Sequence, residues 1–440
     1  MTEFEGVVTA GARFRDRYGL PVTTASALAA ERYADGVERL LTGEAGGAAC
    51  IEQALGADPD CALVQAAVAI LRRGAGQLPA AAEHARRAVL LAQRATARER
   101  GHAEAVAALV GEPPARALAR LMSHLEAYPR DALLAYQALM LMAAGAGAGD
   151  PAARVVLYER LAPHYGDDWW FTLSYAFELN EQGRAAEARP LAEAALARRP
   201  RNASAAHTYA HVLYAAGEVA AGAAFLAPWL AAADPGGAYR EHNAWHLAVF
   251  ELARARARAA LAVYERELSP PTDAAGPAVL LATGAASLLW CCLVYGYPPE
   301  VLRWGPLRDY VARTGSQVVA FRALWDAHEA AAYAGAGDRA ALEGLTARLR
   351  GADAEAYPAA RAVVLPVAEG LRAFAAGAYA EAARRLTAVE ADLAQLGGSN
   401  EQRDTFADTL IAAQLRAGQH AAAAQRLRRR LARRPWARDA

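Results

Sequence analysis

The chain has 440 residues, with 47 basic and 47 acidic side chains and a formal net charge of zero at pH 7. This balance excludes the strongly basic surface that binds nucleic acid or anionic membranes, so neither partner is expected. Hydrophobic residues make up 55% of the chain, and alanine and leucine dominate, a composition that favours closely packed helices.

The cysteines and the start of the chain bear on its location. Cys50, Cys61, Cys291 and Cys292 show no Cys-x-x-Cys spacing. The segment that begins at Met1 lacks a basic stretch followed by an apolar one, as a signal peptide would have. We therefore predict a cytoplasmic protein whose thiols are reduced.

Residues 1–150 carry weak repeat signals and are predicted to form an N-terminal domain of degenerate helical repeats. Segments 54–59 and 127–129 resemble repeat ends, because proline stops a helix. The Gly/Ala run at 143–149 resembles a dinucleotide loop, but no predicted strand precedes it. We interpret it as a turn.

Residues 151–440 repeat clearly and are predicted to form a C-terminal domain of tetratricopeptide-like hairpins. The expected inter-helix turns are at Gly183, Gly217, Arg254, Gly337, Gly377 and Gly418, and prolines recur at Pro200, Pro235 and Pro270. Gly183 and Gly217 are thirty-four residues apart, the length of one tetratricopeptide repeat. The predicted fold is an all-α, right-handed superhelical solenoid.

One uncharged stretch, residues 274–299, is long enough to cross a bilayer. It contains Gly276, Pro277 and Gly284, which are typical of neither a regular span nor an exposed helix. We interpret the stretch as a buried helix of the solenoid, and predict no membrane partner.

Two histidine pairs, His207/His211 and His242/His246, carry the clearest chemical signal. Within each pair the spacing of four places both rings on one helix face. The pairs are thirty-five residues apart, so they occupy equivalent positions on neighbouring repeats. We expect the four imidazoles to converge in a concave pocket, with His328 as a fifth candidate.

Three interpretations of this cluster are open. Two facing pairs of imidazoles can hold zinc or another divalent metal. Without a metal, the five histidines can act as catalytic acids and bases, because neighbouring imidazoles lower one another's pKa. They can also be structural, with each ring hydrogen-bonded between packed helices.

Aromatic and charged residues flank the predicted pocket and are candidate ligand-binding residues. They are Asp168, Trp169, Trp170, Glu178, Trp245, Trp290, Gln402, Arg403 and Asp404. Each tryptophan has core packing as its alternative. The segment from Gly397 also predicts a capping box between Ser399 and Gln402, and Arg403 could bind a carboxylate or phosphate.

These motifs together resemble the tetratricopeptide-repeat protein thirty-eight family. The segments that carry the resemblance are D-D-W-W at Asp167, A-H-x-x-A-H at Ala206, H-N-x-W-H-x-A at His242, S-L-L-W at Ser287, F-x-x-x-x-D-x-H at Phe321 and G-G-S-x-x-Q-R-D at Gly397. The resemblance implies an all-α superhelix and no settled activity. Members often have arginine after S-L-L-W, where this chain has Cys291 and Cys292, so the role of these two cysteines is open.

The sequence thus predicts a helical-repeat protein that binds a small-molecule ligand in a His-rich pocket, with acid/base or metal chemistry as an enzymatic role. The alternative is a tetratricopeptide scaffold that binds a protein partner on the solenoid surface. The pocket interpretation requires the superhelix to turn tightly, because His328 and residues 402–404 lie over eighty residues after His246.

Overall fold

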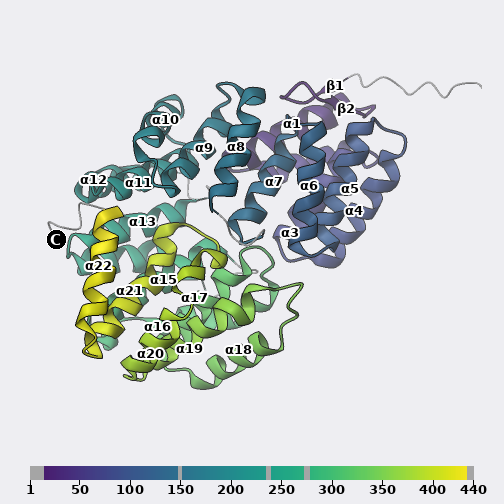
Figure 1. Cartoon of the computed structure of the whole chain (residues 1–440). Coiled ribbons are helices and arrows are strands. Elements are labelled where there is room, and N and C mark those ends of the chain that lie inside the picture. Colours follow the sequence, from purple (N-terminus) through teal and green to yellow (C-terminus); the bar gives the residue numbers. More distant parts are fainter. Residues whose placement is uncertain (1–13, 147–150, 234–238, 272–277, 434–440) are drawn as a thin grey trace, which may run out of the picture. The chain divides into compact units, whose positions relative to one another are not determined.

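The computed structural model describes residues 14–146, 151–233, 239–271 and 278–433 (Figure 1). It divides into two compact units, unit 1 over Met1–Met140 and unit 2 over Leu141–Ala440. The separate roles given to segments 1–150 and 151–440 stay predictions. Pro235, Gly276, Pro277 and residues 147–149 of the predicted turn at 143–149 lie outside the described residues.

Unit 1 begins with two short antiparallel strands, β1 (Phe14–Arg15) and β2 (Pro21–Val22), which the sequence did not predict. Helices follow in this order: α1 (Ala27–Thr42), α2 (Gly47–Ala57), α3 (Ala62–Gly74), α4 (Leu78–Ala92), α5 (Ala97–Gly111) and α6 (Pro114–Ala127). The next helix, α7 (Ala132–Ala143), crosses the boundary between the units.

Unit 2 is built from helical hairpins. Its helices are α8 (Pro151–Tyr165), α9 (Trp169–Glu181), α10 (Ala185–Arg198), α11 (Ala203–Ala216), α12 (Val219–Ala232), α13 (Arg240–Ala253), α14 (Ala257–Val263), α15 (Val279–Val294), α16 (Trp304–Thr314), α17 (Arg322–Ala336), α18 (Arg339–Gly351), α19 (Leu365–Ala375), α20 (Tyr379–Thr387), α21 (Asn400–Arg416) and α22 (His420–Arg433). Shorter 3-10 or π-helical segments are η2 (Tyr264–Leu268), η3 (Pro299–Val301), η4 (Gly315–Gln317), η5 (Ala360–Val364) and η6 (Glu390–Leu396). The predicted all-α solenoid is confirmed.

The predicted hairpin turns have a common backbone cause. At the end of α11, Gly217 takes φ 78°, a left-handed conformation that glycine adopts without a Cβ penalty. The other predicted glycine turns have positive φ as well. After α13 the turn falls at Ala255, which has φ 57° and so takes the conformation that glycine takes elsewhere. The capping box of Ser399 and Gln402 is also present, at the start of α21.

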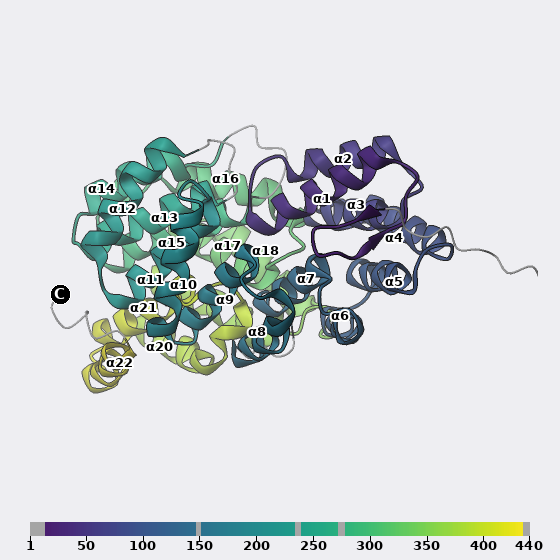
Figure 2. The same ribbon diagram turned by 90° about the horizontal axis from the view of Figure 1, so that it is seen from above.

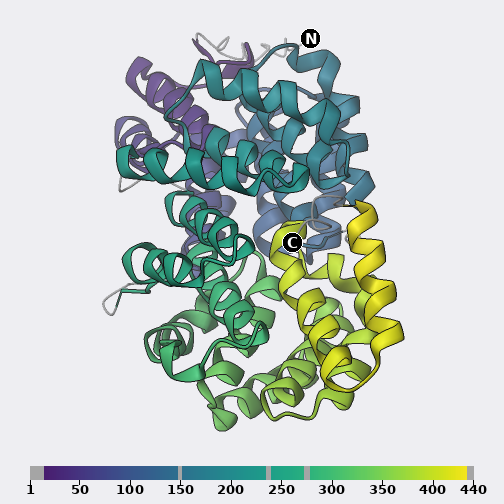
Figure 3. The same ribbon diagram turned by 90° about the vertical axis from the view of Figure 1, so that its left-hand side faces the viewer.

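The first helices of successive hairpins, α11, α13, α15 and α17, pack on one another in order (Figure 2). The chain then returns to these first helices, as the packing of α21 on α15 shows. Asn400 at the start of α21 also donates from its backbone N–H to Glu181 Oε2 at 2.7 Å. Figure 3 shows the yellow C-terminal helices of unit 2 back beside its teal helices. Unit 2 therefore turns tightly enough for α9 and α21 to meet.

The uncharged stretch forms α15, a buried helix in the core of unit 2. Ala285, Leu289 and Trp290 on this helix are each 0% exposed. Within the described ranges, no helix is both long enough and apolar enough to cross a membrane. The composition of this stretch therefore reflects packing against α13, α17 and α21.

Candidate functional site

The four paired histidines meet inside unit 2. His207 and His211 project from α11, and His242 and His246 project from α13. The nearest ring centroids are 4.4 to 5.2 Å apart. One ring nitrogen from each histidine lies within 4.8 Å of the others. Because α11 packs on α13, the thirty-five-residue offset predicts this convergence correctly.

A chain of polar contacts runs through His211. Its Nε2 lies 2.9 Å from His207 Nε2, so one of the two nitrogens carries the proton between them. On the other side of the ring, His211 Nδ1 lies 2.9 Å from Glu401 Oε2 and 3.6 Å from Glu181 Oε1. A proton on Nδ1 faces these carboxylates and leaves Nε2 as an acceptor toward the other histidines.

The ring nitrogens of the second pair, His242 and His246, have fewer hydrogen-bond partners. Both ring nitrogens of His246, and Nδ1 of His242, are buried without a hydrogen-bond partner among the described residues. Burial lowers the pKa of His246 well below its ordinary value, and lowers the pKa of His242 to about 3. Both rings are therefore neutral at pH 7, and each keeps a buried N–H, which costs about 1–3 kcal/mol when it lacks an acceptor.

Aromatic rings enclose the four histidines. Phe177 stacks on His207 at 5.4 Å, and Tyr239 lies 4.9 Å from the same ring. Trp245 stacks on His242 at 5.0 Å and is 1% exposed. Trp245 therefore orients a histidine by packing, and has no exposed face for the ligand that the sequence suggested.

The structure adds two carboxylates that sequence reasoning missed. Glu181 at the end of α9 and Glu401 in the first turn of α21 are each 2% exposed at the side chain. Burial and the neighbouring Glu401 raise the pKa of Glu181 to about 7. Glu401 occupies a variable position of the G-G-S-x-x-Q-R-D motif. Only the return of α21 to α9 brings the pair together.

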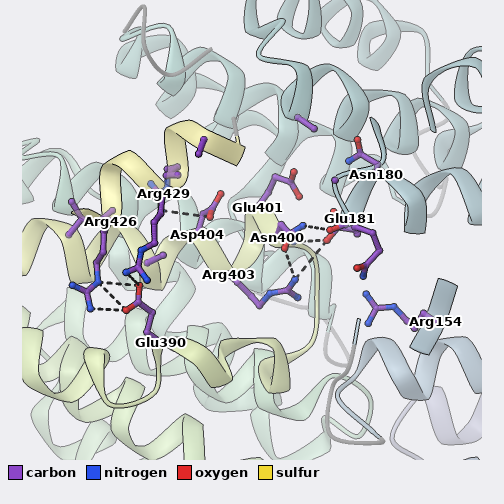
Figure 4. Close-up of a pocket in the computed structure, with 17 residues that line it drawn as sticks. Arg154, Asn180, Glu181, Glu390, Asn400, Glu401, Arg403, Asp404, Arg426 and Arg429 are labelled. Carbon is purple, nitrogen blue, oxygen red and sulfur yellow. Dashed lines mark hydrogen bonds and ion pairs between the residues drawn. The ribbon is translucent and has the colours of Figure 1, made fainter. Parts of the chain in front are cut away.

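A cavity of about 610 Å³ adjoins this pair (Figure 4). Its polar lining residues include Arg154, Asn180, Glu181, Glu390, Asn400, Glu401, Arg403, Asp404, Arg426, Arg429 and Arg430. Glu181 and Glu401 thus have two neighbours, the cavity and the ring of His211. The carboxylates link a polar cavity to a buried set of imidazoles.

The predicted segment 402–404 reaches this cavity in part. Arg403 and Asp404 line it. Arg403 Nη1 donates to Gly397 O and Gly398 O, and its Nη2 donates to Asn400 Oδ1. The guanidinium therefore holds the loop before α21, and is less available to a ligand than the sequence suggested. Gln402 is the buried capping partner of Ser399 and does not line the cavity.

Among the other predicted ligand-binding residues, Glu178 accepts from Arg154 Nε at 2.8 Å, and the remaining ones cap or pack. Asp168 caps α9 by accepting from the Phe171 backbone N–H at 3.0 Å. Trp169 and Trp170 are buried in the core, and Trp169 Nε1 donates to Ala195 O at 3.0 Å. Trp290 Nε1 donates to Thr409 Oγ1 at 2.8 Å across the α15–α21 contact. Asp168 and these tryptophans therefore cap a helix or pack in the core, and do not line the cavity.

His328 stands apart from the four clustered rings. It lies on α17, packs on Phe406 of α21 at 5.1 Å, and its Nδ1 lies 2.8 Å from Leu324 O. It is not in any group of mutually close metal-ligating atoms in the part of the chain that the structure describes. Burial raises the pKa of the Cys291 thiol, which favours the neutral thiol over the nucleophilic thiolate.

Unit 1 contains a second histidine group that the sequence did not indicate. His102 Nδ1 and His124 Nε2 each lie 2.9 Å from Asp131 Oδ2, and Arg98 Nε donates to the same oxygen at 2.9 Å. The Arg98 guanidinium holds the pKa of Asp131 well below its usual range, against the opposing effect of burial. Three donors converge on one carboxylate, and His102 Nε2 is the ring nitrogen of this group that is buried without a partner among the described residues. We interpret the group as a structural network.

Comparison with known proteins agrees with the repeat architecture. Residues 179–241 match the tetratricopeptide repeat family model, a segment that contains His207 and His211. Residues 179–241 of unit 2 are therefore a tetratricopeptide repeat segment within a helical-repeat fold. The resemblance to the thirty-eight family stays a prediction.

Two solved structures illustrate the likeness. A tetratricopeptide repeat protein from Parabacteroides merdae is 15% identical, with 60% of this chain and 93% of that chain covered and a TM-score of 0.34. The human IFIT1 dimer with m7Gppp-AAAA is 13% identical, with 93% of this chain and 91% of that chain covered and a TM-score of 0.40.

Proposed function

We propose that unit 2 binds one divalent transition-metal ion through His207, His211, His242 and His246. The observation that carries this proposal is His246, whose two ring nitrogens are buried without a hydrogen-bond partner beside three other imidazoles. Buried polar atoms are almost always satisfied in native proteins. A metal ion among the four rings satisfies the facing nitrogens at once.

The distances suit such an ion. Zinc binds imidazole nitrogen at about 2.0–2.1 Å, so tetrahedral ligand atoms stand about 3.4 Å apart. The four nitrogens lie within 4.8 Å, and the His207–His211 pair is at 2.9 Å. Small rotations of the rings cover the difference. Imidazole ligands suit zinc, copper, nickel and iron, so the proposal is for this class of metals.

The charges suit it as well. Four neutral imidazoles leave a bound dication uncompensated, and a buried charge needs a counter-charge nearby. Glu401 and Glu181 supply it through His211, since a carboxylate behind a ligating histidine fixes its tautomer and raises its basicity. The lowered pKa values of His207, His242 and His246 also favour the neutral form that binds metal.

Metal content tests the proposal. Protein purified without a histidine tag is expected to contain about one transition-metal ion per chain, and the metal-free protein is expected to give a tetrahedral Co²⁺ absorption spectrum on titration. His246→Ala should abolish the spectrum, and His420→Ala, at an exposed position of α22, should preserve it. A wild-type protein that binds neither Zn²⁺ nor Co²⁺ contradicts the proposal.

A protein-interaction scaffold is the second candidate, supported by the tetratricopeptide repeats at residues 179–241. The two functions are compatible, because the metal lies inside unit 2 and leaves the outer helix faces available. With four imidazoles a tetrahedral ion has no open position, so an enzymatic role needs a metal of higher coordination number or the release of one histidine. The enzymatic role would be supported only by turnover of a substrate that the metal-loaded protein catalyses and the metal-free protein does not.

A further inference from the structure

The cavity beside Glu181 and Glu401 contains a buried cation with unused donors. Arg154 on α8 lines the cavity, and its side chain is 6% exposed. Its Nε donates to Glu178 Oε2 at 2.8 Å, which fixes the guanidinium plane. Among the described residues, no hydrogen bond involves its two terminal nitrogens. Such donors are normally paired when an arginine is this deeply buried.

A second guanidinium faces the first. Figure 4 shows Arg154 and Arg403 extending toward one another from opposite sides of the cavity. Arg403 is satisfied by its own loop and by Asn400, but its charge stays in place. Burial and, to a smaller extent, the nearby Arg154 lower the pKa of Arg403, against the opposing effect of Glu181, whose Oε2 lies 3.9 Å from Arg403 Nη2. Two cations that approach one another in a buried site favour an anion between them.

The other arginines that line the cavity already form ion pairs within the protein. Arg426 and Arg429 pair with Glu390, and Arg430 pairs with Asp408. The amide of Asn180 also lines the cavity, and its Oδ1 is buried without a hydrogen-bond partner in the part of the chain that the structure describes. The cavity thus offers cationic donors from Arg154 and a free acceptor from Asn180. A volume of about 610 Å³ suits a small molecule.

We infer that this cavity binds a small oxyanion, a carboxylate or phosphate, whose anionic group is held by the terminal nitrogens of Arg154 and whose donor group reaches Asn180 Oδ1. A planar guanidinium with a fixed Nε presents two parallel N–H groups, which match a carboxylate or phosphate in bidentate fashion. This inference adds a ligand to the proposed metal protein but does not depend on the metal.

Isothermal titration of the full chain with inorganic phosphate, succinate and malate tests the inference. Each titration is run on chelator-treated protein and again after zinc loading. Saturable binding of phosphate, of the dicarboxylates or of both is expected in the metal-free protein, and identifies the anion class. Because malate carries a hydroxyl donor that succinate lacks, it should bind more tightly, and Asn180→Ala should remove that preference.

Arg154→Gln should weaken anion binding about tenfold or more, since hydrogen bonds to charged groups are strong. This change leaves Glu178 buried without its cation, so Arg154→Gln/Glu178→Gln is measured beside it, with circular dichroism as the check of folding. Arg339→Gln, an exposed change at the start of α18, is the matched control. The inference is wrong if the folded wild type binds none of the three anions, or if the double variant binds them as the wild type does. The anion titrations of the chelator-treated protein do not depend on zinc, so a failure of zinc to bind would contradict only the proposed metal site.

Discussion

Two buried histidine groups in this protein differ in what satisfies them. In unit 1, His102 and His124 face a central carboxylate, Asp131, which also accepts from Arg98. In unit 2, four imidazoles face one another with no carboxylate between them, and Glu181 and Glu401 lie behind His211. Burial is therefore the same, but in unit 1 one ring nitrogen, His102 Nε2, is buried without a partner within the described ranges, whereas in unit 2 His246 lacks a partner at both ring nitrogens. That lack distinguishes a candidate binding site from a structural network.

The largest effect is expected from Asp131→Ala in unit 1. The change removes the carboxylate that accepts from Arg98 Nε and leaves Asp16, at 3.7 Å from Arg98 Nη2, as the remaining counter-charge. Removing one partner of a buried ion pair costs about 3–5 kcal/mol. All eight tryptophans follow residue 140, so their fluorescence reports on unit 2 alone. Hydrogen exchange of α5 should show lost protection, with little change in the fluorescence transition. Asp60→Ala, at an exposed aspartate, is the control. Unchanged exchange of α5 in Asp131→Ala would show that the network is not structural.

His246→Leu, unlike Asp131→Ala, should not destabilise the protein. In chelator-treated protein it is expected to leave the fluorescence melting temperature unchanged or raise it, because it removes two unpartnered polar atoms at similar volume. Zinc should stabilise the wild type by about 2.7 kcal/mol at a concentration one hundred times Kd, and should not stabilise the variant. An equal zinc effect on both proteins would place the metal elsewhere.

Glu401→Gln tests the carboxylate behind His211. The four imidazoles remain, so we expect zinc to bind about 10–100-fold more weakly, by competition with a chromophoric chelator. The capping box of α21 does not involve Glu401, and the fold should persist. Glu187→Gln, on the exposed side of α10, is the matched control. Equal affinities in the two variants would mean that Glu401 does not support the metal.

The smallest effect concerns acid stability of unit 1. Burial lowers the pKa of His102 from its ordinary 6.5, with Asp131 opposing and Arg98 and His124 adding to the shift. The unfolded chain then binds a proton below pH 6.5 that the folded unit does not, so stability falls as the pH drops from 6.5 toward the folded pKa. Asp131, whose pKa is depressed, loses its contribution only below about pH 4.

Hydrogen exchange of α5 at pH 7 and pH 5.5, corrected for the intrinsic rates, measures this loss. His102→Gln should flatten the dependence, because glutamine does not titrate. A dependence that persists in the variant would assign the acid sensitivity to another group in unit 1.

Periodic features of the sequence predicted a large part of this protein. Glycine turns such as Gly183 and Gly217 follow from backbone sterics, and the capping box at Ser399 follows from the bonding needs of a helix start. The meeting of His207, His211, His242 and His246 follows too, since helix geometry fixes the spacing of four and the repeat length fixes the offset of thirty-five. Each of these relations is local or joins neighbouring repeats.

Only the tertiary structure decided which distant residues join the site. Glu181 and Glu401 meet because the small rotation of each repeat adds up to a turn that returns α21 to α9. The same accumulated rotation places Trp290 against Thr409 in the core and leaves His328 outside the four-imidazole group. Per-repeat rotation depends on side-chain packing between helices, which no single repeat encodes. The sequence alone therefore determined the imidazoles, and tertiary packing determined their carboxylates and the cavity beside them.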